Sequence, residues 1–81
     1  MKAAAIRKLC EVHETSVLEG AAETLAETGE APIAVDGEDA GEQLTHVLLA
    51  TRVRQRMDKG EPLKDAFRAE MAAVRDLLTN D

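Results

Sequence analysis

Apolar residues near the N-terminus repeat with the spacing of a helix. Ile6, Leu9, Cys10 and His13 stand at i, i+3, i+4 and i+7, so a helix would carry all four on one side. Two of the four bear a thiol and an imidazole. The pattern therefore predicts a first helix here and makes the same stripe both a candidate core face and a candidate chemical site.

A second short helix is predicted directly after the first. Ser16 and Glu19 have the three-residue spacing of a capping box, so we expect Ser16 to cap the start of the helix. Gly29 is suited to end it, because glycine adopts the left-handed conformation without steric cost. Its apolar side would consist of Val17, Leu18, Ala21, Ala22, Leu25 and Ala26.

Residues 30–39 interrupt the helical pattern. Pro32 disfavours a helix at the residue before it, and Asp36-Gly37 is typical of a turn. Residues 33–35 are apolar enough for a short strand, but a strand needs a partner and no other segment has a strand pattern. We therefore predict a loop.

The longest helix is predicted from Asp39 to Lys59. Asp39 is a suitable N-cap with Glu42 three residues later, and Gly60 is a suitable C-cap. The apolar residues form two stripes, with Leu44, Val47, Leu48 and Thr51 on one side and His46, Leu49, Val53 and Met57 on another. A helix that is apolar on two sides contacts neighbours on both, so we expect it at the centre.

A final helix is predicted from Pro62 to the end of the chain, since proline is favoured in a first turn. One apolar face continues along it through Leu63, Ala66, Phe67, Met71, Val74, Leu77 and Leu78. The short link before it makes the last two helices an antiparallel hairpin. The chain is thus predicted to be one all-α domain, residues 1–81, forming a small bundle of three to four helices.

Composition adds an expectation of self-association. With 81 residues and one aromatic side chain, the core is small and aliphatic, so the chain buries little apolar area by itself. An interface between copies supplies the missing area, and we therefore expect a homodimer or a higher homo-oligomer. We place its contact layer on the last two helices, at Leu48, Val53, Met57, Phe67 and Met71.

The net charge of −6 narrows the range of partners. Nucleic acids and anionic lipid surfaces both require a basic protein surface, so neither is an expected partner. No segment has the length and apolarity of a membrane span or of a secretory signal, and a single cysteine cannot form an internal disulfide. We expect a cytoplasmic protein without a cofactor.

Cys10 and His13 also form half of a common metal-binding pattern. A thiolate and an imidazole suit zinc or copper, and Glu42 and His46 at i, i+4 on the long helix would complete four ligands. An unpaired cysteine is, however, among the most buried residue types, and we favour core packing. A metal-binding or thiol-redox module built on Cys10, His13 and His46 is the alternative. An enzyme is not expected, because no third residue is evident that would orient Cys10 and His13.

A basic stripe on the long helix consists of Arg52, Arg56 and Lys59. It would suit an acidic partner, a phosphate or RNA. Acidic residues are so plentiful that ion pairing across the last two helices is the favoured interpretation. Glu70 lies at the edge of the last apolar stripe, and we expect it at the boundary between core and solvent.

Two stretches, MKAAAIRKLCE and GEQLTHVLLATRVRQRMDKGEPLKDAFRAEMAAV, resemble a small family of uncharacterised helical proteins of Bacteroidetes. Its members have a similar length, a short apolar and basic start, and a helix, a glycine turn and a helix at the end. The resemblance implies a helical architecture and no assigned activity. We therefore expect a small interaction or assembly protein that acts by binding.

Overall fold

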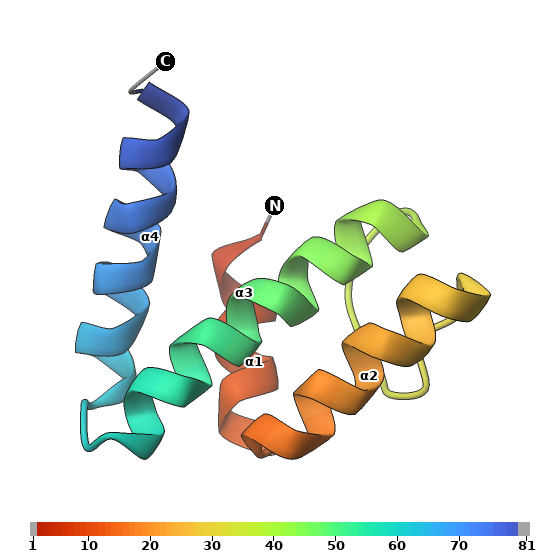
Figure 1. Cartoon of the computed structure of the whole chain (residues 1–81), viewed down its shortest axis with the longest axis horizontal. Coiled ribbons are helices and arrows are strands. Elements are labelled where there is room, and N and C mark those ends of the chain that lie inside the picture. The colour runs from red at the N-terminus through yellow and green to blue at the C-terminus, as the bar shows by residue number, and fades with distance from the viewer. Residues whose placement is uncertain (1, 80–81) are drawn as a thin grey trace.

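Four helices form the fold in the computed structural model, which describes residues 2–79 and side chains through Arg75. They are α1 (Ala3–Val12), α2 (Thr15–Thr28), α3 (Ala40–Asp58) and α4 (Leu63–Thr79). No strand occurs among the described residues, and residues 30–39 connect α2 to α3 as a loop (Figure 1). The predicted all-α bundle with a C-terminal helical hairpin is confirmed.

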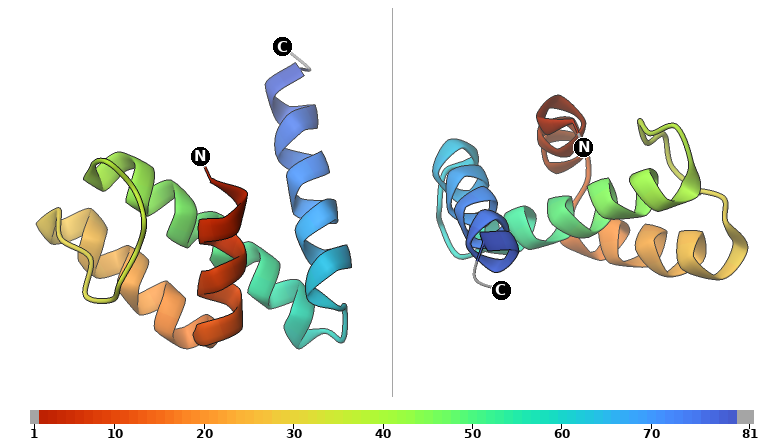
Figure 2. Two further views of the ribbon diagram at one scale, coloured as in Figure 1. Left: turned by 180° about the vertical axis from the view of Figure 1, so that it is seen from behind. Right: turned by 90° about the horizontal axis from the view of Figure 1, so that it is seen from above.

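α3 is the central helix of the bundle. α1 and α2 lie on either side of it, and α4 packs against its C-terminal half (Figure 2). Its buried residues are His46, Val47, Leu49, Ala50, Thr51 and Val53. Both predicted stripes therefore face neighbouring helices, with the exception of Leu48, whose side chain is 49% exposed.

The corner between α1 and α2 differs from its prediction. α2 begins at Thr15, one residue before the expected cap, and neither Glu14 nor Ser16 caps it with a side chain. The capping box is therefore wrong, and a tertiary contact holds the corner instead. The Thr15 hydroxyl donates a hydrogen bond of 2.6 Å to Asp58 at the end of α3.

The other helix ends follow their local sequence. Gly29 ends α2 with a φ of 77°, in the left-handed conformation that favours glycine. Asp39 caps α3, because its Oδ1 accepts a hydrogen bond of 2.8 Å from the backbone N–H of Glu42. Gly60, with a φ of 107°, follows the last residues of α3 in a Schellman-type turn whose N–H groups bond back to Arg56 and Met57.

α4 turns back from α3 and diverges from it along its length (Figure 1). Ala66 on α4 is fully buried, whereas Phe67, Met71 and Val74 are half-buried and pack against the edge of the core. The predicted continuation of this apolar face, at Leu77 and Leu78, lies outside the described side chains. None of the described helices is long and apolar enough to cross a membrane.

Candidate functional site

The thiol of Cys10 is part of the core. Its side chain is fully buried, and Sγ donates a hydrogen bond of 3.3 Å to the backbone carbonyl of Ala50 on α3. Burial raises the pKa of this thiol from 9.0 to about 11, although the nearby Arg54 guanidinium partly opposes the shift. A thiol that stays protonated at neutral pH is a poor nucleophile and a poor metal ligand.

The alkaline pKa of Cys10 predicts a pH-dependent stability. Between pH 9 and 11 the unfolded chain loses the thiol proton while the folded chain keeps it, so unfolding becomes more favourable as the pH rises. The free energy of unfolding should be unaffected by this group below pH 9 and should fall by about 2 kcal/mol by pH 11. Urea unfolding at a series of pH values measures the fall, and Cys10→Ala should make the slope shallower. Identical slopes for both proteins would contradict the prediction.

The imidazole of His46 is engaged on both nitrogens. It is fully buried on α3, where Nδ1 lies 2.7 Å from the carbonyl oxygen of Asp36 and Nε2 accepts a hydrogen bond of 3.0 Å from the backbone N–H of Lys2. The ring thus carries its proton on Nδ1 and donates it to the loop. Its role in this structure is to join the N-terminus and the loop to α3.

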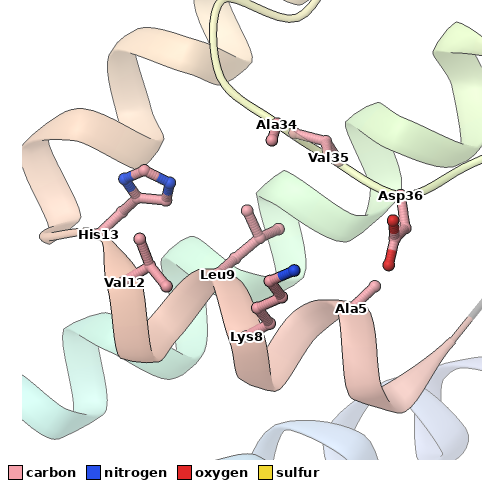
Figure 3. A pocket seen from close by; sticks show the side chains of 8 residues that line it. All are labelled: Ala5, Lys8, Leu9, Val12, His13, Ala34, Val35 and Asp36. Carbon is pink, nitrogen blue, oxygen red and sulfur yellow. The ribbon is translucent and has the colours of Figure 1, made fainter.

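His13 and Glu42 do not complete a metal site with Cys10 and His46. His13 ends α1 and lines a pocket of about 90 Å³ with Lys8 and Asp36 (Figure 3), while the Glu42 carboxylate accepts a hydrogen bond from the backbone of the loop. Among the described residues, no three His, Cys, Asp or Glu side chains are grouped as metal ligands would be. The structure therefore does not favour the metal or thiol-redox alternative.

A buried carboxylate of α4 engages the basic stripe of α3. Glu70 is only 5% exposed, and its two oxygens lie 2.7 Å from Nε of Arg56 and 3.0 Å from Nε of Arg52. The hydrogen bond to Glu70 raises the pKa of Arg56 further above its usual value. Ion pairing between the last two helices is therefore confirmed. The boundary position predicted for Glu70 is wrong, because two arginines compensate its charge inside the interface.

An uncovered groove lies between α1 and α4. We call it the α1–α4 groove. It has a volume of about 570 Å³ and is lined by Arg7, Leu63, Lys64, Phe67 and Arg68. Among the described side chains, its lining combines two apolar residues with three cations and includes no acidic residue. The guanidinium of Arg7 lies 5.5 Å from the centre of the Phe67 ring, a favourable cation–π distance.

The groove stands out against the charge of the rest of the chain. Residues 9–51 contain ten acidic side chains and no Lys or Arg, whereas residues 52–75 contain seven basic and four acidic ones. The acidic segment comprises the end of α1, all of α2, the loop and the first part of α3; the loop and the helix ends that it joins lie on the side of the molecule away from α4 (Figure 1). The long acidic segment thus contains no cation, and three cations line the groove.

Comparison with known proteins places the chain in a family. The profile of a family of unknown function, DUF6952, matches residues 1–78 and so includes every residue that lines the groove. The chain belongs to the DUF6952 family. The resemblance to a family without an assigned activity is therefore confirmed. No curated protein and no solved structure matches the chain.

The contact layer predicted for this DUF6952 chain is divided among different places. Phe67 lines the groove, Met57 and Met71 are half-buried at the edge of the core, and Leu48 is exposed on α3 outside the groove lining. Val53 is fully buried within the single chain, so its side chain cannot contact a second copy and does not belong to the contact layer.

The cations around Phe67 were missed by the sequence reasoning. Arg7 is sixty positions away from Phe67, and no local spacing connects the two. The segregation of charge along the sequence could have indicated a cationic surface. Residues 9–51 contain no Lys or Arg, so the cations are concentrated in the rest of the chain.

Proposed function

We propose that the protein acts by binding, as a small cytoplasmic helical protein that associates with a second copy of itself through the α1–α4 groove. The observation that carries the proposal is the lining of this groove, in which the apolar side chains Leu63 and Phe67 are bordered by three cations and by no carboxylate of the described part of the chain. A buried free thiol at Cys10 agrees with a reducing compartment.

The energetics of the fold favour an occupant for this groove. α4 diverges from the bundle, so its outward apolar side chains are supported by α1 and α3 along one side only. Covering Leu63 and Phe67 would remove apolar area from water, at about 25 cal/mol for each Å². Charges around an apolar centre contribute mainly to partner choice and association rate, so this groove should select an acidic surface.

The test compares two sets of exposed substitutions by sedimentation equilibrium and native mass spectrometry. Replacing Lys64 and Arg68 together with glutamate should weaken self-association at least about tenfold, because both side chains are exposed and line the groove. Leu48→Glu is a control for a negative charge placed elsewhere, since Leu48 is exposed outside the groove lining and its replacement should leave association intact.

Circular dichroism should show native helix content in both variants. A wild-type protein that stays monomeric at high micromolar concentration would refute the proposal. Self-association that is lost in Leu48→Glu but kept in the double variant would place the contact on α3 and also refute the groove.

A further inference from the structure

The outer side of α2 carries a row of carboxylates. Glu19, Glu23 and Glu27 follow each other at four-residue spacing and are all exposed, so they lie one above the other on one side of the helix. The ion pairs of Arg52, Arg54 and Arg56 join side chains between residues 52 and 70 and do not involve this row. Three like charges on adjacent turns destabilise a helix unless something compensates them.

Gly20 lies on the same outer side of α2, between the first two carboxylates. It is exposed, and a Cβ atom built on it would have no other atom within 4 Å. Glycine inside a helix is less stable than alanine, and the packing of the single chain gives no reason for it here. A residue without a side chain makes this side of α2 flat and lets another helix approach closely.

We propose that α2 of a second copy occupies the α1–α4 groove, with Glu19, Glu23 and Glu27 facing its cations. This inference rests on the proposed function and names the surface that fills the groove. Lys64 and Arg68 are also four residues apart on a helix, so their charges have the same axial spacing as the carboxylates of α2.

An exposed apolar side chain lies beside the carboxylate row. Val17 is 42% exposed one turn before Gly20 on α2, and in the proposed pairing it would contact the apolar part of the groove, Leu63 and Phe67. The pairing therefore has the form of a helix laid into a groove, in which apolar side chains supply affinity and charges set the orientation.

The occupant must come from another molecule. In one chain α2 packs along α3 and runs away from α4, so a chain cannot place its own α2 in its own groove (Figures 1 and 2). The complementary charges nevertheless belong to the same sequence. A surface that is acidic along one helix and basic in a groove elsewhere is complementary to a second copy of itself.

Reciprocal charge reversal tests the pairing. The groove variant replaces Lys64 and Arg68 with glutamate, and the helix variant replaces Glu19 and Glu23 with lysine. Each variant alone should associate at least about tenfold more weakly than the wild type, because like charges then meet. An equimolar mixture should regain association, because the acidic groove of one variant now faces the basic helix of the other.

Sedimentation equilibrium at about 0.05 M ionic strength is the measurement, and about 0.5 M salt should weaken both the wild-type and the mixed association. The control variant replaces Glu30 and Glu38 with lysine. It changes the net charge by the same amount as the helix variant does, but it alters exposed residues outside α2. It should associate like the wild type.

A mixture that stays monomeric would overturn the inference. So would a helix variant that associates normally while the groove variant does not, and that result would leave the proposed use of the groove intact. A monomeric wild type would instead refute the proposed function itself, so the two failures are distinguishable.

Discussion

Replacing Arg52 and Arg56 together with methionine is expected to remove about 3–5 kcal/mol of the free energy of unfolding. Both arginines hold the carboxylate of Glu70, which is 5% exposed between α3 and α4. Without them the carboxylate stays buried next to apolar side chains and has no compensating charge. A domain of this size has a total stability of roughly 4–12 kcal/mol, so the double variant should be close to unfolding.

Removing the carboxylate of Glu70 should lower the free energy of unfolding much less than removing the two arginines. The side chains of Arg52 and Arg56 are 51% and 35% exposed, so in Glu70→Leu both guanidinium groups can turn to water. Adding Glu70→Leu to the double methionine variant should restore most of the lost stability, because an apolar cluster then replaces the ion pairs. Urea unfolding followed by circular dichroism measures all three variants. Equal losses for the double variant and for Glu70→Leu would show that the burial of the charge is not what matters.

His46→Leu is expected to destabilise the protein by about 2–4 kcal/mol, since it leaves two hydrogen-bonding groups without their partner. The backbone N–H of Lys2 and the carbonyl of Asp36 both bond to this fully buried ring. Leucine has nearly the same side-chain volume as histidine, so the loss of stability should reflect the missing hydrogen bonds and not a cavity.

Amide hydrogen exchange locates the effect of this substitution. The first turn of α1 and the loop around Asp36 should exchange faster, because both bond to His46, while α4 should change only with global stability. His46→Gln is the conservative control, because its amide retains one donor and one acceptor and should recover part of the stability. An equal loss in both variants, with no local change in exchange, would contradict this role of His46.

The features predicted correctly from the sequence are those that depend on neighbouring residues. Gly29, Asp39 and Gly60 end or begin helices as expected, because their conformations and caps involve residues within one turn. The two apolar stripes of α3 likewise predicted a central helix, since helical periodicity alone determines which residues share a side.

Incorrect predictions concern residues whose environment comes from another helix. α2 begins at Thr15 because a hydroxyl–carboxylate contact with Asp58 of α3 holds the corner, and this contact leaves no trace in local spacing. Glu70 is buried because two arginines on α3 reach it, although its own position in the stripe suggested an edge. Val53 is enclosed by neighbouring helices, and so it belongs to the core of one chain and not to a contact layer.

The candidate site divides in the same way. Pattern and composition alone determined that this is a small all-α chain with its charges segregated along the sequence. Only the tertiary structure decided that Cys10 and His46 are used inside the fold, and that Arg7 meets Phe67 beside a groove. The physical reason is the separation of the contacting residues along the chain. A local pattern encodes contacts within a few residues, whereas the packing of α1 and α4 on α3 determines which distant side chains meet.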